Sequence, residues 1–424
     1  MANYRNRIMD ELLKDKLEAT GAVLIEGPKW CGKTTTAEQI AQSVIYMADT
    51  EKREQNMLYA RIEPDRILGG KSPRLVDEWQ IAPILWDAIR YRVDHSDELG
   101  RFILTGSAVP ADRSEMTHTG TGRFAWLRMR PMSLWESGES SGEVSIASLF
   151  DGKPLCIADS EVHKLEDIAF LACRGGWPQA VSLERRKAAL EQAFNYLDAV
   201  VESDISRVDG VARDPDRTRL LMQSYARLQG TQATSAVIMA DMAPNDRLSD
   251  VTLNSYLKAL RKIFVIEDMP AWNPNLRAKV AIRTSDTRYF VDPSIATAAL
   301  GLGPSALIDE LPTFGFVFET LVMRDLRVYA GALAGEVRHY KDKSGLECDA
   351  VVRLRDGRYG LVEVKIGGPR LVDEGAQNLN ELAARIDTKR MKKPSFKMVV
   401  TAVGECAFAR DDGIYVCPIG CLRP

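Results

Sequence analysis

One short run near the N-terminus restricts the possible folds of this chain more than any other part of its sequence. Residues 27–34, Gly-Pro-Lys-Trp-Cys-Gly-Lys-Thr, match the phosphate-loop pattern G-x-x-x-x-G-K-[ST] at every fixed position. The apolar residues 22–25 precede the run as an expected strand, and residues 35–44 follow it as an expected helix. A loop in this position can surround a phosphate with backbone N–H groups at the positive end of the helix dipole. The run therefore predicts an α/β domain with a parallel sheet and a nucleotide-phosphate site.

The side chains of this run are expected to bind ATP and Mg²⁺ together. Lys33 is placed to reach the β- and γ-phosphates, and the Thr34 hydroxyl is placed to hold Mg²⁺. The other positions are expected to contribute backbone N–H groups and the shape of the loop. The predicted nucleotide-binding residues here are Gly27, Pro28, Lys29, Trp30, Cys31, Gly32, Lys33, Thr34 and Thr35.

Two further apolar segments end in polar residues, as strands at a nucleotide site do. Residues 75–76 lead into Asp77 and Glu78. We expect Asp77 to hold the Mg²⁺ shell and Glu78 to polarise the attacking water. Residues 101–104 lead into Thr105-Gly106-Ser107, and two interpretations of the Thr105 and Ser107 hydroxyls stay open: they sense the γ-phosphate, or they only belong to a capped turn.

Further motifs extend this pattern, namely Val76-Asp77-Glu78-Trp79-Gln80, Leu104-Thr105-Gly106-Ser107, Gly122-Arg123-Phe124 and Arg130-Pro131-Met132-Ser133-Leu134-Trp135-Glu136. Over essentially its whole length, the chain resembles bacterial and archaeal AAA-type ATPases whose C-terminal domain of unknown function has a PD-(D/E)XK nuclease-like fold. The resemblance implies that Arg123 contacts the γ-phosphate, in its own chain or from a neighbouring subunit. The alternative is a structural ion pair. An arginine acting from a neighbouring subunit predicts nucleotide-dependent formation of a homo-oligomer.

The resemblance and the apolar periodicity divide the chain into four expected parts. Residues 1–136 are expected to form a P-loop AAA-type ATPase core, and 137–230 a helical lid. Residues 231–302 are expected to form a winged-helix-like segment, and 303–424 an α/β PD-(D/E)XK nuclease-like domain. The fold class predicted for the whole chain is therefore α/β.

The winged-helix interpretation depends on two expected helices and a wing. The helices are expected over residues 233–242 and 251–264, and the wing over residues 266–292. Lys258 and Arg261 lie on the outward face of the second helix, which is compatible with entry into a DNA major groove. The alternative is that the segment only packs domains together. The buried stripe of the second helix is expected to contain Leu253, Tyr256, Leu257 and Leu260.

Composition excludes several other classes of protein. The formal net charge is -3, so any nucleic-acid site must be local rather than a property of the whole surface. No apolar run approaches the ~20 residues of a membrane span, and residues 1–7 lack the apolar core of a signal peptide. Seven cysteines without paired spacing are typical of the reducing cytoplasm, where we expect the chain to reside. No zinc site is expected, because Cys406, Cys417 and Cys421 have no fourth ligand nearby in sequence.

A second candidate site lies near the C-terminus, where Asp349 is followed by Glu363 and Lys365. Two expected strands, residues 348–354 and 358–366, flank an Asp-Gly pair. A two-residue turn places the two carboxylates on opposite faces of the hairpin. A three-residue turn over 355–357 instead pairs Asp349 with Glu363 and pairs apolar residues with apolar ones, so this register is predicted.

Facing carboxylates repel unless a positive charge lies between them, so the pair predicts a Mg²⁺ site. Lys365 shares the face of Glu363 and is expected to hold the attacking water or to stabilise the phosphorane charge. The resemblance adds Glu319 as a third metal ligand and Gln377 on the following helix. Two alternatives stay open, a retained but idle nuclease fold and a partly buried ion-pair cluster.

The sequence therefore predicts an ATP-binding and ATP-hydrolysing protein that is also an ATP-gated nuclease, acting on DNA in preference to RNA. The alternative is an ATP-dependent switch that binds nucleic acid or a protein partner through a catalytically idle nuclease-like domain. The basic residues 385–393 favour a nucleic-acid partner, although a run of charges is usually a solvated face.

Overall fold

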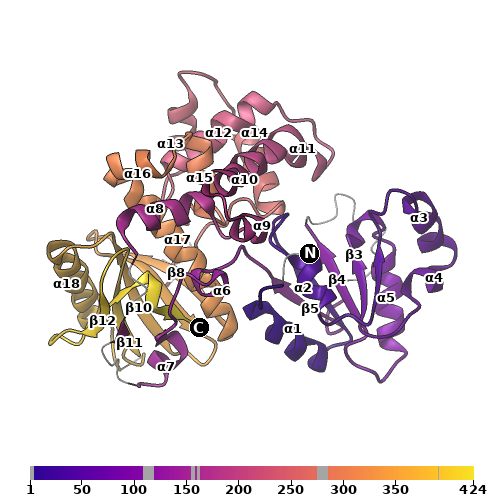
Figure 1. Ribbon diagram of the computed structural model, residues 1–424, viewed down its shortest axis with the longest axis horizontal. Coiled ribbons are helices and arrows are strands. Elements are labelled where there is room, and N and C mark those ends of the chain that lie inside the picture. Colours follow the sequence, from indigo (N-terminus) through magenta and orange to yellow (C-terminus); the bar gives the residue numbers. More distant parts are fainter. Residues whose placement is uncertain (1–3, 108–118, 154–157, 160–162, 275–284, 390) are drawn as a thin grey trace. The chain divides into compact units, whose positions relative to one another are not determined.

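The computed structural model describes residues 4–107, 119–153, 158–159, 163–274, 285–389 and 391–424 (Figure 1). Contacts within the chain divide it into two compact units. Within the described ranges, no helix has the length and apolar character that crossing a membrane requires. Unit 1 comprises Met1–Pro131, Val200–Asp214 and Ser255–Val265, and unit 2 comprises Met132–Ala199, Pro215–Asn254 and Ile266–Pro424.

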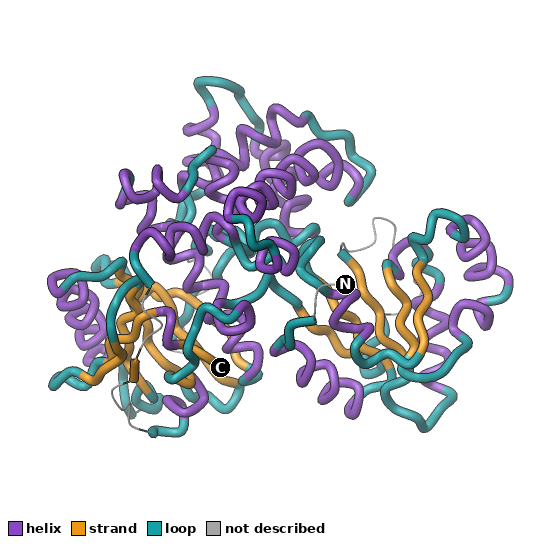
Figure 2. Tube along the Cα trace, in the orientation of Figure 1, coloured by secondary structure: helices purple, strands orange, loops and turns teal. Residues whose placement is uncertain are grey.

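Unit 1 contains a five-stranded sheet in the order β2-β3-β4-β1-β5, with every neighbouring pair parallel. Helices alternate with these strands along the chain, which confirms the predicted parallel α/β domain (Figure 2). The strands are β1 (Ala22–Glu26), β2 (Ser43–Tyr46), β3 (Arg74–Asp77), β4 (Phe102–Gly106) and β5 (Phe124–Arg128). The helical segments are α1 (Ile8–Ala19), α2 (Lys33–Glu38), α3 (Arg53–Ile62), α4 (Pro64–Leu68), η1 (Trp79–Ile81), α5 (Leu85–Asp94), η2 (Val200–Asp204) and α11 (Ile205–Arg207).

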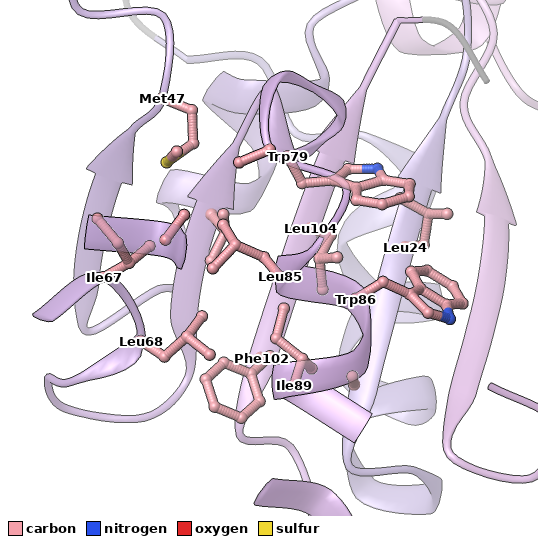
Figure 3. Close-up of a cluster of buried hydrophobic side chains, with 14 of the residues drawn as sticks. Leu24, Met47, Ile67, Leu68, Trp79, Leu85, Trp86, Ile89, Phe102 and Leu104 are labelled. Atoms are coloured by element: carbon pink, nitrogen blue, oxygen red, sulfur yellow. The ribbon is translucent and has the colours of Figure 1, made fainter. Parts of the chain in front are cut away.

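A hydrophobic core holds the α3–α5 side of this sheet together (Figure 3). Leu24 and Leu104 project from neighbouring strands towards Leu85 and Trp86 of α5. Trp86 also stacks on Phe124, with ring centroids 3.8 Å apart. Large aromatic rings bury much apolar area, so this contact fixes α5 against β5.

Unit 2 contains a seven-stranded mixed sheet in the order β7-β12-β13-β11-β10-β9-β8. Helix α17 (Leu311–Ala332) contacts β8, β9 and β10, and α18 (Pro369–Arg385) contacts β9, β10 and β11. The sheet strands are β7 (Ala158–Asp159), β8 (Gly335–Lys341), β9 (Glu347–Leu354), β10 (Tyr359–Lys365), β11 (Phe396–Thr401), β12 (Cys406–Ala409) and β13 (Tyr415–Pro418). A separate pair joins β6 (Val144–Ser145) to β14 (Leu422–Arg423), which follows η4 (Ile419–Cys421).

Among the remaining helices of unit 2, α15 (Pro293–Leu300) is central and contacts α8, α10, α12 and also α17. The helix predicted over residues 233–242 is α13, and the one predicted over 251–264 is α14, which crosses the boundary between the units. The predicted buried stripe of α14 is confirmed. The expected wing is reduced to the isolated bridges Ile266↔Phe290 and Met269↔Thr287, while residues 275–284 lie outside the described ranges. The helices are α6 (Leu134–Ser137), α7 (Ile146–Phe150), α8 (Leu165–Arg174), α9 (Pro178–Ser182), α10 (Arg186–Ala199), α12 (Pro215–Arg227), α13 (Ser235–Met242), α14 (Asp250–Lys262) and α16 (Pro304–Asp309).

The interval predicted as a helical lid, residues 137–230, differs from this expectation at its start. Strand β6 pairs with β14 at the C-terminus, and β7 pairs with β12. Residues of the expected lid therefore complete sheets formed by the C-terminal part. Local periodicity cannot reveal such pairing, because the partner strands lie hundreds of residues away in sequence.

A buried ion cluster in unit 2 explains why the segment after β5 takes a defined course. Arg324 lies between Asp292 and Asp325, at 3.1 Å and 2.8 Å, and all three side chains are at most 1% exposed. Asp325 Oδ2 accepts a hydrogen bond from the Leu134 backbone N–H at the start of α6. Ser133 caps the same helix end through a capping box with Glu136. The motif around residues 130–136 is thus held by both capping and charge.

Candidate functional site

The phosphate loop leads from β1 into α2 at the carboxyl end of the parallel sheet in unit 1. Gly27 lies so close to the residue that follows β5 that a Cβ atom on Gly27 would lie 2.1 Å from the Met129 carbonyl oxygen. Gly32 caps α2 with a φ of 100°, a conformation that glycine adopts without steric cost. Cys31 is buried beneath the loop and Thr35 is exposed. The two glycines therefore permit the tight course of this loop.

Lys33 is the central cation of the loop. It is only 6% exposed, and its Nζ donates to the carbonyl oxygens of Gly27 at 3.0 Å and Pro28 at 2.7 Å. No carboxylate pairs with it among the residues that the structure describes. Neutral carbonyl oxygens accept hydrogen bonds from this buried ammonium but do not neutralise its positive charge. An anion would neutralise it, so the residues present fit a phosphate group.

Asp77 brings the loop and two strands together. Its Oδ1 accepts hydrogen bonds from the hydroxyls of Thr34 and Thr105, each at 2.6 Å. Thr34 and Asp77, the two predicted Mg²⁺ ligands, are therefore adjacent. The Thr105 hydroxyl, one of those considered for γ-phosphate sensing, instead orients the Asp77 carboxylate. These oxygen donors fit Mg²⁺.

Glu78 follows Asp77 in a left-handed conformation with a φ of 54°. Its Oε2 accepts a hydrogen bond from the Gln80 side-chain amide and a longer one, 3.4 Å, from the Ser107 hydroxyl. Ser107 thus lies against the predicted water-polarising carboxylate. Gln80 is a site residue that sequence reasoning did not assign, although its place two residues after Glu78 in the quoted motif was a usable signal.

Two other residues of the loop are exposed. Lys29 pairs with Asp204 of η2, with an Nζ–Oδ1 distance of 2.5 Å. Trp30 adopts a φ of 64° and is 47% exposed. A bulky residue with positive φ is strained, and such strain persists where the surrounding structure determines it.

Arg123 directly precedes β5 and lies at the amino end of the parallel strands, whereas the phosphate loop lies at their carboxyl end. Its carbonyl oxygen accepts from the N–H of Ala22, the first residue of β1, and its side chain pairs with Asp94. The length of β1 separates Arg123 from the loop, which argues against contact of Arg123 with phosphate in its own chain. The structural ion pair is present instead, and action from a neighbouring subunit stays a prediction.

The second candidate site lies on the β9–β10 hairpin of unit 2. Leu361 pairs with Val351 and Val362 pairs with Ala350, which confirms the register of a three-residue turn. Gly357 of the turn has a φ of 85°. One step further along this register, Asp349 stands opposite Glu363, as predicted.

Asp349 borders a pocket of about 390 Å³, whereas Glu363 lies behind Lys365 and is not among the residues that line it. Glu319 of α17 also lines it and accepts a hydrogen bond from the Tyr289 hydroxyl. The sequence did not indicate Tyr289 or the other walls, because they come from separate parts of the chain. The lining residues are Gly230, Thr231, Gln232, Thr287, Tyr289, Phe316, Glu319, His339, Tyr340, Lys341, Glu347, Cys348, Asp349, Val364 and Lys365.

Lys365 occupies the place that sequence reasoning gave to a cation. Its Nζ lies 2.8 Å from Glu363 Oε2 and 3.7 Å from Asp349 Oδ2. This arrangement matches the ion-pair alternative. Across the described parts of the chain, no three or more His, Cys, Asp or Glu side chains are grouped so as to hold a metal. The predicted Mg²⁺ site therefore stays a prediction.

Burial controls the charges of this pocket. Burial, followed by the negative charge of Asp349, raises the pKa of Glu363 to about 8. Burial raises the pKa of Asp349 despite the neighbouring Lys365, and it raises that of Glu319 well above its usual value. Glu363 Oε1 is buried without a hydrogen-bond partner, whereas Asp349 Oδ2 accepts from the Val364 N–H at 2.8 Å. The orphaned oxygen is one feature that fits a divalent cation.

One expectation near this pocket is not met. Gln377 is exposed and does not line the pocket, because the buried stripe of α18 consists of Val372, Gly375, Ala376, Leu379 and Leu382. Gly375 faces the site, where an added Cβ would lie 3.4 Å from Glu363 Cβ. In the basic run, Arg385 pairs with Asp342 and Glu381, and Arg390 lies outside the described residues.

Comparison with solved structures finds a Walker-type ATPase of Pyrococcus abyssi with a TM-score of 0.42 and 15% identity, covering 70% of this chain and 99% of that chain. Uncharacterized proteins of Mycobacterium bovis and Mycobacterium tuberculosis are each 23% identical over 356 residues, which is 83% of this chain and 72% of each relative.

Three family models match separate parts of the chain. Residues 165–306 match a domain of unknown function (DUF8612), and residues 314–422 match another (DUF4143). Residues 19–137 match the AAA domain, in agreement with the parallel sheet and phosphate loop. Residues 19–137 are therefore similar to AAA domains, and this similarity supports binding and hydrolysis of ATP.

Proposed function

We propose that the chain is a Mg²⁺-dependent ATPase whose C-terminal pocket cleaves phosphodiester bonds of DNA under the control of ATP. The observation that carries the ATPase part is the buried Lys33 ammonium, bonded to neutral carbonyls beside the Thr34–Asp77 pair. A nucleotide phosphate would neutralise the Lys33 ammonium, and the oxygens of Thr34 and Asp77 are ligands that suit Mg²⁺.

Each residue of the nucleotide site has a separate task in this proposal. Lys33 and the loop N–H groups bind the phosphates and stabilise charge that develops on them. Thr105 holds Asp77 in place, while Gln80 and Ser107 orient Glu78 towards the attacking water. Mg²⁺ held by Thr34 and Asp77 would offset the negative charge of the phosphate oxygens.

In the C-terminal pocket, Asp349, Glu363 and Glu319 are proposed to bind a divalent cation. The orphaned Glu363 Oε1 supports this role. Lys365 would then move from the carboxylates to the scissile phosphate, where an ammonium stabilises the developing negative charge. The cation would supply Lewis-acid activation of that phosphate.

A second candidate function is an ATP-dependent switch with an idle pocket that binds nucleic acid or a protein partner. The observation that favours it is the short Lys365–Glu363 contact, 2.8 Å, because a satisfied ion pair needs no metal. Winged-helix-like binding of DNA by α14 belongs to either candidate, since Lys258 and Arg261 are exposed.

The test is ATP turnover of the purified chain with Mg²⁺, with and without double- or single-stranded DNA, followed by analysis of the DNA on a gel. We expect the wild-type chain to hydrolyse ATP and to cut DNA. Lys33→Ala should abolish ATP turnover, and Asp349→Asn should abolish cutting. ATP turnover with uncut DNA would reject the nuclease and favour the ATP-dependent switch. Absence of both ATP turnover and ATP binding would overturn the ATPase assignment.

A further inference from the structure

We infer that Asp204 is a positioning residue for the nucleotide site and acts by competing with the nucleotide phosphates for the Lys29 ammonium. The inference rests on the proposed ATP site and adds a residue that lies far from the phosphate loop in sequence. Lys29 Nζ lies 2.5 Å from Asp204 Oδ1, and both residues belong to unit 1. A carboxylate from a distant segment therefore already binds a cation of the phosphate loop.

The Asp204 carboxylate is held by a firmly braced segment. Asp204 ends the π-helical turn η2, and π turns are rare features that occur often at functional sites. Its side chain is only 11% exposed. The same segment is braced by the buried Arg213, which donates to the Ile205 carbonyl at 2.8 Å and to the Ser255 hydroxyl at 3.2 Å. The carboxylate is thus presented by fixed backbone rather than by a loose loop.

The two lysines of the phosphate loop differ in their partners. Lys33 is buried and contacts neutral carbonyls, so it meets a phosphate without losing an ion pair. Lys29 is 45% exposed and bound to a carboxylate. Its flexible four-carbon stem lets the ammonium move, but it can neutralise only one of the two anions at a time. Only the Lys29 ammonium therefore has to exchange an anion when nucleotide binds.

The exchange of anions at Lys29 predicts the direction in which the Asp204 carboxylate changes the affinity for MgATP. A phosphate that recruits Lys29 leaves the Asp204 carboxylate unneutralised close to another anion, which opposes binding. Replacing the carboxylate by an amide removes this opposition. Because the pair is partly exposed, we expect MgATP to bind only about two- to fivefold more tightly in Asp204→Asn. By reciprocity, bound MgATP must weaken the Lys29–Asp204 ion pair. The η2 segment then loses this contact, and its amide hydrogen exchange should rise.

The experiment is calorimetric titration of MgATP into the full-length wild-type, Asp204→Asn, Lys29→Met and double variants at low salt. Asp198→Asn is the matched control, because it removes a carboxylate of the preceding helix α10 that pairs with Arg219 instead. Tighter binding in Asp204→Asn is expected, reduced at high salt by screening. No further gain is expected from Asp204→Asn once Lys29 is Met, and exchange over residues 200–207 should rise with MgATP.

Equal or weaker MgATP binding in Asp204→Asn than in wild type would overturn the inference while leaving the ATP site intact. A gain of equal size in the Lys29→Met background, or in the Asp198→Asn control, would also overturn it, because the effect would then not pass through Lys29. Failure of the wild-type chain to bind MgATP would overturn the proposed function together with this inference. The two failures are therefore distinguishable.

Discussion

The nucleotide site and the C-terminal acid pocket hold their central lysines in opposite ways. Lys33 is buried against carbonyl oxygens at 2.7 and 3.0 Å, so an anion improves its environment. Lys365 is also largely buried, but it lies 2.8 Å from the Glu363 carboxylate. The first site is thus ready for its ligand, whereas the second is already neutralised and must rearrange before it binds a cation.

The difference shows why the contiguous motif is stronger evidence for a binding site than the dispersed one. The phosphate loop is contiguous, and its backbone supplies much of the binding, so the residues of the motif form most of the site by themselves. The acidic motif supplies side chains that a nuclease, an idle fold and an ion-pair cluster would all contain. Measurements on variants of Lys365 and its acidic partners separate these cases.

The largest effect is expected for Lys33→Ala, which should lower ATP turnover by about a hundredfold to a thousandfold, because it removes a preorganised charge at the phosphates. Turnover at saturating ATP measures it. Lys14→Ala is the control, because that lysine is 53% exposed and pairs with Glu11 on α1. Equal turnover in the wild-type and Lys33→Ala proteins would break the comparison at the nucleotide site.

Lys365→Met sharpens the comparison at the acid pocket. Removing the ammonium leaves the buried Glu363 carboxylate facing Asp349, which should lower the free energy of unfolding by about 3 kcal/mol. Urea denaturation measures it. The control Lys341→Met removes an exposed pair with Glu347 from the pocket rim and should cost under about 1 kcal/mol.

The same variant separates a metal site from an ion-pair cluster. If the carboxylates bind Mg²⁺, then millimolar Mg²⁺ should raise the Tm of Lys365→Met more than that of Lys341→Met. An equal response in both variants would favour the ion-pair cluster. Either result fixes which of the two arrangements the pocket can adopt.

Gly230→Ala tests whether the wall of the acid pocket is rigid. Gly230 has a φ of 71°, and an added Cβ would lie 2.7 Å from Phe316 Cδ1. We expect a loss of about 1–2 kcal/mol in the free energy of unfolding. Gly345→Ala is the matched control, with a φ of 88° but open space around its Cβ. Equal losses in the two variants would show that Phe316 yields and that the wall is soft.

The smallest effect is expected for Arg123→Ala in dilute protein. Because Arg123 lies at the amino end of the strands, away from the phosphate loop, turnover should change by less than about twofold. Turnover is measured over a range of protein concentrations, with sedimentation in the presence and absence of ATP. A loss that appears only at high concentration, together with ATP-dependent association, would indicate action from a neighbouring subunit.

Sequence reasoning succeeded where neighbours in space are also neighbours in sequence. The parallel α/β domain followed from the order strand, loop and helix around residues 27–34. The hairpin register followed from pairing apolar residues across a short turn, and Val351 does pair with Leu361. The stripe of α14 followed from helical spacing alone. In each case, a few residues contain enough information to specify the geometry.

Sequence reasoning failed where distant segments meet. Pairing of β6 with β14 and of β7 with β12 left no local trace. The same is true of Tyr289, which orients Glu319, and of Asp204, which binds Lys29. Gln377 was misplaced for a different reason, because the phase of α18 depends on which stripe packs against the sheet.

The sequence by itself determined the phosphate loop, the order of strands and helices around it and the facing of Asp349 and Glu363, because local chain geometry is set by glycines, turns and alternating burial. The tertiary structure decided the partners of every charged group at both sites. It placed Arg123 at the amino end of the strands beside Asp94, Lys365 between two acids and Asp204 against the phosphate loop. Charge interactions depend on distance and burial, and both are fixed only when separate segments pack together.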